Sequence, residues 1–173
     1  MRQEELVIRD ARPEECAALG RLMVEVYSGL EGFPRPEEQP KYYEMLANIG
    51  QMTQKPGARL LVAVRGAALL GGVVYFADMA QYGSGGSATR ETNAAGFRLL
   101  AVAPGARGSG AGRALAGRCV ELAREDRLGQ VIIHTTNAMR IAWAMYAKMG
   151  FERSPDLDFM QGELQVFGFR LAL

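Results

Sequence analysis

Two patterns of apolar residues alternate along the chain. Short apolar runs rich in β-branched residues predict strands, and apolar residues spaced three or four positions apart predict helices. After Pro13, for example, Leu19, Leu22, Met23 and Val26 recur on one helical face. The predicted strands are residues 6–9, 60–64, 71–76, 99–102, 130–134, 151–153 and 164–171. The predicted helices are residues 13–29, 36–52, 108–126 and 139–149.

This order of elements suits an α+β fold, an α/β sandwich. We expect a mixed, mostly antiparallel sheet of six to seven strands, flanked by about four helices. With 173 residues and 49% hydrophobic content, the chain is expected to form a single domain over residues 1–173. Residues 78–93 lack periodicity and are rich in glycine, so they predict a long mobile loop of the kind that often carries function.

Charge and cysteine content narrow the functional classes. The 20 basic and 19 acidic side chains give a net charge of +1, which does not favour nucleic acid or a membrane surface as partner. Cys16 and Cys119 lie far apart without a spaced set of His and Cys partners, so we expect neither a metal nor a disulfide framework. No apolar stretch approaches a membrane span or a signal peptide, which predicts a cytoplasmic protein.

A glycine-rich turn connects the predicted strand 99–102 to the next helix. Gly108, Gly110 and Gly112 leave the first amides of that helix accessible, and the helix dipole adds partial positive charge, which suits phosphate groups. A dinucleotide-binding turn would need glycine or alanine in place of Arg113, and a nucleotide-hydrolysing loop would need a lysine. A turn that only packs the helix on the sheet stays open as an alternative.

Three segments, in chain order, resemble the GNAT superfamily of acetyl-CoA-dependent N-acetyltransferases. Arg107, Gly110 and Gly112 match the signature Gln/Arg-x-x-Gly-x-Gly/Ala that follows a strand in this family. Residues 142–151 are similar to the later helix of the family, which typically ends in Leu-Tyr-x-Lys-x-Gly-Phe. Residues 7–15 are similar to the opening Ile-Arg-x-Ala-x-Pro-Glu-Asp of many members, so the resemblance extends over residues 6–151.

The resemblance implies that acetyl-CoA is the acyl donor. The turn would hold its pyrophosphate, and the backbone of the preceding strand would stabilise the oxyanion. The implied cofactor contacts are Leu100, Ala101, Val102, Arg107, Gly108, Ser109, Gly110, Ala111, Gly112, Arg113, Asn137 and Trp143. Met139 stands where many members have an asparagine that contacts the pantetheine, so Asn137 or Thr136 would have to replace that contact.

The resemblance also implies groups that move protons. Tyr146 matches the tyrosine that protonates the leaving thiolate, and the phenol pKa of about 10 suits that role. Gly96 occupies the position of a common strand glutamate, so either a relay through water or a base from elsewhere is required. His134 is the expected base because the usual histidine pKa is about 6.5. The alternatives are that Tyr146 only packs on the sheet and that His134 is structural. Other candidate bases are Glu25, Glu31, Asp78 and Glu91.

The acceptor is predicted to be a primary amine of a small molecule or peptide, acetylated by direct attack in a ternary complex. Four aromatic residues are candidates to line its pocket, although local packing would also explain them: Phe33, Tyr42, Tyr43 and Tyr82. The alternative functions are a non-catalytic module that binds or senses acyl-CoA, and O-acyl or aminoacyl transfer on the same scaffold. Because homodimers are common in the family, the resemblance also implies a homodimer as one assembly.

Overall fold

The computed structural model describes residues 4–173. Its strands are β1 (Leu6–Asp10), β2 (Ala58–Arg65), β3 (Ala68–Phe76), β4 (Ala94–Val102), β5 (Gln130–Thr135), β6 (Glu152–Arg153), β7 (Phe159–Gln161) and β8 (Leu164–Ala172). Its α-helices are α1 (Cys16–Ser28), α2 (Pro40–Ala47), α3 (Ala111–Glu125) and α4 (Arg140–Lys148). Each predicted helix and strand has a counterpart in the structure. The three-residue strand β7 was not predicted.

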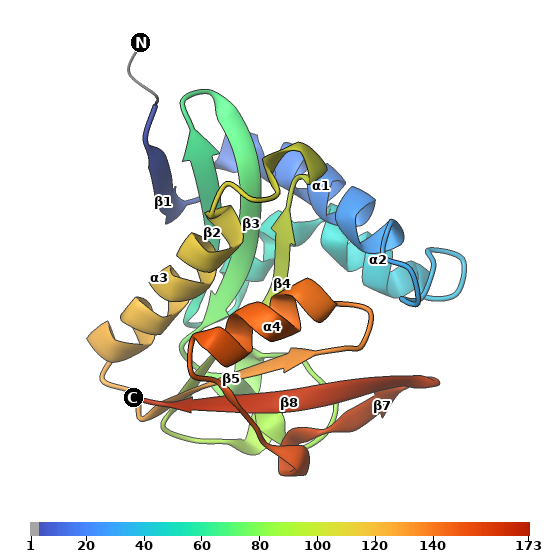
Figure 1. Cartoon of the computed structure of the whole chain (residues 1–173), viewed down its shortest axis with the longest axis vertical. Helices are drawn as coiled ribbons and strands as arrows, with labels where there is room; N and C mark the ends of the chain where they lie inside the picture. The colour runs from blue at the N-terminus through green and yellow to red at the C-terminus, as the bar shows by residue number, and fades with distance from the viewer. Residues whose placement is uncertain (1–3) are drawn as a thin grey trace.

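The strands form one mixed sheet with the order β1-β2-β3-β4-β5-β8-β6, and β7 pairs with β8 (Figure 1). The β4–β5 pair is parallel, and the other described pairs are antiparallel. This confirms the predicted α+β class and the mostly antiparallel sheet, which has eight strands instead of six to seven.

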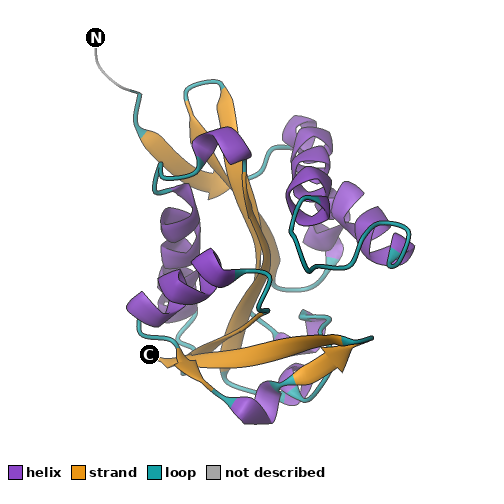
Figure 2. Cartoon of the chain, turned by 45° about the vertical axis from the view of Figure 1, so that its right-hand side comes forward, coloured by secondary structure: helices purple, strands orange, loops and turns teal. Residues whose placement is uncertain are grey.

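Helices cover both faces of the sheet (Figure 2). Helices α1 and α2 pack on one face, where Leu19, Met23 and Leu46 are fully buried. Helix α3 packs on the other face, where Leu115 and Cys119 are fully buried, and α4 lies on the same side. Burial of these apolar stripes is the main contribution that fixes the helices on the sheet.

Strands β4 and β5 diverge and so create a gap in the middle of the sheet. Their parallel register runs only from Ala94 opposite Gln130 to Gly96 opposite Ile132. Beyond these residues, β4 continues along β3 while β5 continues along β8 (Figure 1). The gap opens at the end of β4 that leads into the glycine-rich turn.

A β-bulge interrupts β4 just beyond the point of divergence. Arg98 pairs with Val74 and Ala101 pairs with Gly72, so Leu99 and Leu100 together oppose one residue of β3. Leu99 has a φ of 63°, which is unusual for a residue with a side chain. Because of the extra residue, Leu99 joins the core beneath α1 and α2, while Leu100 faces the α3 side.

Residues 78–93 are folded onto the sheet. They contain two 3-10 turns, Met79–Gln81 and Ala88–Arg90, and the side chains of Met79, Tyr82 and Ala88 are at most 1% exposed. The expectation of a loop without structure is therefore corrected. Periodicity does not detect single buried anchors of this kind.

Cys16 and Cys119 are both free thiols. Within residues 4–173, no helix is both long enough and apolar enough to cross a membrane.

Candidate functional site

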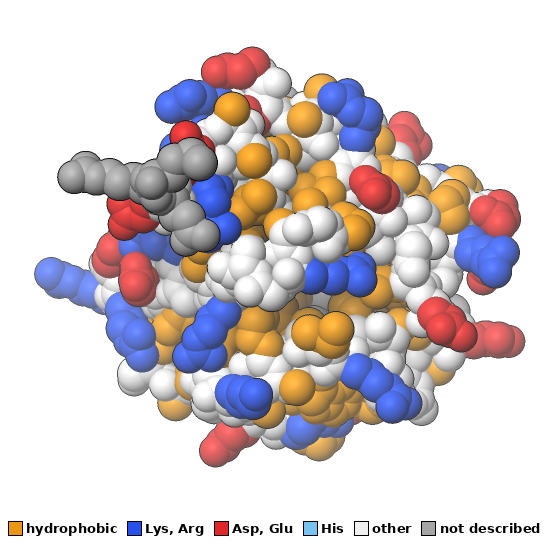
Figure 3. Space-filling view, turned by 45° about the horizontal axis from the view of Figure 1, so that its top comes forward, with side chains coloured by type: hydrophobic (Ala, Val, Ile, Leu, Met, Phe, Trp, Pro, Cys, Tyr) orange, Lys and Arg blue, Asp and Glu red, His pale blue; other side chains and the backbone are white. Residues whose placement is uncertain are grey.

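A cavity of about 1220 Å³ occupies the gap between β4 and β5. One end lies at the glycine-rich turn and the start of α3, and the other end lies against the aromatic residues of α1, α2 and the loop between them. Figure 3 shows a hollow lined by apolar side chains, with Lys and Arg side chains around it. The cavity thus connects the predicted phosphate site to the predicted acceptor pocket.

The glycine-rich turn has a backbone that requires glycine at two positions. Gly108 has a φ of 80° and Gly110 a φ of 87°, both in the left-handed region. A Cβ atom added at either position would meet no atom within 4 Å, so both glycines face open space. The amides of Gly112 and Arg113, in the first turn of α3, have no acceptor within the helix. The turn therefore has the space and the donors that a pyrophosphate requires.

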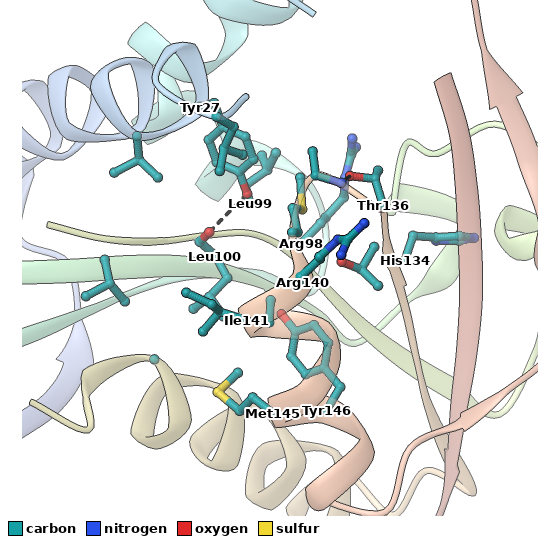
Figure 4. Close-up of a pocket in the computed structure, with 18 of the residues that line it drawn as sticks. Tyr27, Arg98, Leu99, Leu100, His134, Thr136, Arg140, Ile141, Met145 and Tyr146 are labelled. Atoms are coloured by element: carbon teal, nitrogen blue, oxygen red, sulfur yellow. Dashed lines mark hydrogen bonds between the residues drawn. The ribbon is translucent and has the colours of Figure 1, made fainter. Parts of the chain in front are cut away.

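The bulge in β4 interrupts the backbone pairing with β3 next to the cavity. Leu99 and Leu100 have no register partner on β3, whereas Ala101 and Val102 pair with Gly72 and Gly71. Of the three predicted strand positions, only Leu100 therefore lies in the bulge. Its carbonyl oxygen accepts a hydrogen bond of 3.0 Å from the Tyr27 hydroxyl of α1 (Figure 4).

Tyr146 of α4 lies at the same cavity, near its centre. Its ring packs against Phe97 and Phe151, with centroid distances of 5.8 Å to each. Its hydroxyl points into the cavity (Figure 4). It is not among the fully buried polar atoms that lack a hydrogen-bond partner. Burial raises the pKa of Tyr146, so the hydroxyl stays protonated at neutral pH. The residue can donate a proton, and it is also part of the core.

His134 of β5 has both ring nitrogens in hydrogen bonds. Its Nε2 lies 2.9 Å from the carbonyl oxygen of Leu157, so Nε2 must carry the hydrogen, since a carbonyl only accepts. Nδ1 therefore accepts from the Tyr82 hydroxyl, which lies 2.9 Å away. Burial lowers the pKa of His134 below 6.5 and keeps the ring neutral at pH 7. Neither nitrogen is free to contact a substrate directly.

The remaining predicted residues fall into four groups. Arg107, Ala111, Arg113, Asn137, Phe33 and Tyr82 line the cavity, as do Gly108, Gly110, Gly112, Leu100 and Val102. Ser109 lies beside a smaller hollow, and its Oγ accepts from the Ala111 amide at 3.3 Å. Ala101 is buried beneath α1. The expected cofactor contact of Trp143 is corrected, because its ring packs on Phe167 and Phe169 of β8, at 5.2 and 5.0 Å, and is not among the cavity-lining residues.

Sequence reasoning missed several residues that line the cavity. Tyr27 was missed, and it forms an aromatic cluster with Phe33 and with Tyr42, which the sequence had suggested, with centroid distances between 5.5 and 6.1 Å. Arg98 is the one charged residue in β4, and that was a signal that could have found it. Thr135 also lines the cavity, and its Oγ1 is the single buried side-chain oxygen or nitrogen of the described residues without a hydrogen-bond partner.

The other candidate bases do not gather at His134. Glu31 lines the cavity from the exposed loop after α1. Glu91 is paired with Arg170 at 2.7 Å, on the β8 side of the sheet. Asp78 accepts a hydrogen bond from the Ala80 amide at the start of a 3-10 turn, and neither Glu25 nor Asp78 is among the cavity-lining residues. Among residues 4–173, no three His, Cys, Asp or Glu side chains are grouped as a metal site would require.

Comparisons with known proteins agree with this geometry. The chain is similar over nearly its whole length to a GNAT-family acetyltransferase of Staphylococcus aureus (TM-score 0.73, 14% identity, 97% of this chain and 99% of that one). It is also similar to PaiA N-acetyltransferase of Thermoplasma acidophilum, solved with coenzyme A (TM-score 0.69, 16% identity, 95% and 98%). A third similar structure is yncA of Salmonella typhimurium, solved with acetyl-CoA (TM-score 0.63, 17% identity, 97% and 94%).

At these identities the solved structures show a shared fold. No curated protein sequence matches the chain significantly. The acetyltransferase (GNAT) family model matches residues 21–151, which include β4, the glycine-rich turn, α3 and α4. The matched segment thus contains every structural feature that forms the cavity's phosphate end. On this evidence the chain belongs to the GNAT family of acetyltransferases.

Proposed function

We propose that the protein transfers an acetyl group from acetyl-CoA to a primary amine of a small molecule or peptide, by direct attack in a ternary complex. The observation that carries this proposal is the continuity of the cavity. It joins the glycine-rich turn, the β4 bulge and the Tyr146 hydroxyl to an aromatic pocket on the α1 side. Both substrates could therefore occupy it together, as direct transfer requires.

The residues present fit acetyl-CoA. The open space at Gly108 and Gly110, with the free amides of the α3 start, suits the pyrophosphate, and Arg107 and Arg113 add charge. The Asn137 side chain, which lines the cavity, can serve the amide groups of the pantetheine. When bound, acetyl-CoA supplies the thioester that is attacked.

The chain's own residues would supply two of the functions that acetyl transfer requires, stabilisation of the oxyanion and protonation of the leaving thiolate. Backbone N–H groups at the bulge, around Leu100, are suited to donate to the negative charge that develops on the thioester oxygen. As the amine nitrogen bonds to the acetyl carbon and the carbon–sulfur bond breaks, the Tyr146 hydroxyl gives its proton to the leaving thiolate. The raised pKa of Tyr146 keeps that proton in place beforehand.

The amine must also release a proton, and that proton needs an acceptor on the side of the cavity opposite Tyr146. We assign this step to the Tyr82–His134 pair acting as a relay. The Tyr82 oxygen would receive the amine proton as its own hydrogen passes to Nδ1 of His134, which accepts the hydrogen bond in the resting state. The lowered pKa of His134 keeps that nitrogen unprotonated and available at neutral pH.

The cytoplasmic location and the homodimer predicted from the sequence belong to the proposed function as well.

Thiol release from acetyl-CoA in the presence of a library of primary amines tests the proposed function. We expect release that depends on both the protein and an amine. Calorimetric binding of acetyl-CoA without release across the library would instead support a non-catalytic acyl-CoA-binding module. Release that requires an alcohol acceptor would support O-acyl transfer. Failure to bind acetyl-CoA would overturn both the enzyme and the module.

A further inference from the structure

Arg98 lies on the α1 side of β4, at the acceptor end of the cavity. Its Nη1 donates to the carbonyl oxygen of Tyr82 at 2.9 Å, and its guanidinium lies 5.7 Å from the centre of the Tyr82 ring. Figure 4 shows Arg98 in the middle of the cavity, between Tyr27 and His134. The carbonyl bond and the Tyr82 ring fix the position of the guanidinium, so its direction is set before any ligand binds.

Most of the donors of Arg98 have no acceptor in the protein. A guanidinium has five N–H groups, and the described chain provides one acceptor for them, the Tyr82 carbonyl. Arg9, Arg59, Arg118, Arg153 and Arg170 each pair with a carboxylate, but within residues 4–173 no carboxylate lies within 4.0 Å of Arg98. Its other nitrogens are not among the fully buried polar atoms that lack a hydrogen-bond partner. They are therefore available to a ligand in the cavity.

The surroundings of Arg98 favour an anion. Glu31 is the one carboxylate among the described cavity-lining residues, and it is exposed on the loop after α1. The charge of Arg98 opposes the effect of burial on the pKa of Tyr42, which burial raises to about 12. A positive charge in a partly buried, apolar pocket stabilises a carboxylate much more than it would in water, and it disfavours a second cation.

We propose that the acceptor is an amine that also carries a carboxylate, and that Arg98 binds this carboxylate. This inference rests on the proposed function and names the acceptor class as amino acids. The remainder of the acceptor would lie against the aromatic cluster of Tyr27, Phe33 and Tyr42, which favours an apolar or aromatic side chain. With the carboxylate on Arg98, whose guanidinium lies 5.7 Å from the centre of the Tyr82 ring, the neighbouring amine would be directed toward Tyr82, the first member of the relay.

Matched pairs of amines test this assignment. Phenylalanine and 2-phenylethylamine differ by the carboxylate, as do leucine and 3-methylbutylamine. For the wild-type protein we expect kcat/KM to be about tenfold or more higher with the amino acid of each pair, as a charged hydrogen-bonded pair implies. Arg98→Gln should reduce this ratio to within about twofold of unity, and Arg98→Lys should keep part of it.

Arg118→Gln is the matched control, because it removes the same charge from a surface ion pair on α3 and should leave the ratio unchanged. Calorimetric binding of acetyl-CoA, together with the melting temperature, shows that the Arg98 variants are folded. A ratio that Arg98→Gln leaves unchanged would overturn the proposal, as would a wild-type preference for the decarboxylated amines. Both of these outcomes retain acetyl transfer, whereas transfer to no amine at all would overturn the proposed function itself.

Discussion

The hydroxyl of Tyr27 donates a hydrogen bond of 3.0 Å to the carbonyl oxygen of Leu100. This bond links α1, which forms the acceptor wall of the cavity, to the β4 bulge, which is the proposed oxyanion site. Tyr27 is 4% exposed, and burial raises the pKa of its hydroxyl, so the donor is always present. The two halves of the proposed active site are therefore joined by one side chain.

Tyr27→Phe should alter the bulge without changing the shape of the core. We expect the free energy of unfolding to fall by about 1 kcal/mol, the usual value for one such hydrogen bond, and kcat to fall severalfold as the bulge loses its tether. Tyr43→Phe is the control, since Tyr43 also donates to a carbonyl, that of Pro34, but does not line the cavity. Equal losses of kcat in the two variants would show that the Tyr27 bond has no special role.

Tyr146→Phe removes the proposed proton donor and keeps the ring. We expect kcat to fall about 100-fold, a typical loss for a general acid, with little change in acetyl-CoA affinity. Tyr75→Phe is the control, because the Tyr75 hydroxyl donates to Asp126 at 2.7 Å and is not among the cavity-lining residues. That variant should lose stability but retain kcat. Steady-state kinetics that give the same kcat for Tyr146→Phe as for wild type would assign Tyr146 to packing alone.

Gly110→Glu places a carboxylate beside the free amides of the turn and forces a non-glycine residue to a φ of 87°. We expect acetyl-CoA affinity, measured by calorimetry, to fall by at least about 100-fold through lost amide donors and charge repulsion. Gly117→Glu makes the same charge change within α3, where an added Cβ also meets no atom, and should bind normally. Normal binding by a folded Gly110→Glu protein would place the cofactor elsewhere.

The protonation of His134 predicts a pH dependence of stability. Its folded pKa is lowered by burial from the ordinary 6.5, so the unfolded chain binds more protons at this residue as the pH drops below 6.5. The stabilisation is complete above pH 6.5 and is lost as the pH falls toward the folded pKa. Denaturant unfolding between pH 7.5 and about 5.5 should show this decline, and His134→Gln should flatten it. If the free energy of unfolding of the variant falls with pH as steeply as that of wild type, other groups control the loss of stability at acidic pH.

The relay makes a separate kinetic prediction. Tyr82→Phe and His134→Gln should each reduce kcat/KM for the amine, by about 10-fold or more, because each interrupts the same proton path. The double variant should be no worse than the more damaged single one, since groups that act as a unit are not additive. Additive losses in the double variant, or full activity in either single one, would make the pair a packing contact only.

The sequence predicted those parts of the molecule that depend on local patterns. The succession of helices and strands along the chain, the glycine-rich turn and the position of Tyr146 on its helix follow from periodicity and from a motif whose glycines have a conformational reason. The bulge could not be predicted, because leucine at position 99 carries no signal for a positive φ. The bonds from Tyr27 to Leu100 and from Tyr82 to His134 join residues 73 and 52 positions apart, and only the folded sheet brings them together.

Trp143 shows the limit of helical spacing as a guide. It lies three residues before Tyr146 and was expected at the same cavity, but its ring turns toward β8. Spacing places two residues on neighbouring parts of a helix surface and does not say which neighbour each one meets. Arg98 shows the converse case, because its importance depends on which groups surround it and not on any pattern in which it takes part.

Mass spectrometry of the amine after incubation with isotopically labelled acetyl-CoA is the most direct test of acetyl transfer. We expect the label to appear on the amine nitrogen only when the protein is present, and we expect Tyr146→Phe to slow its appearance while Tyr75→Phe does not. Intact acetyl-CoA and unmodified amines across the whole library, with a protein that binds acetyl-CoA, would contradict this expectation.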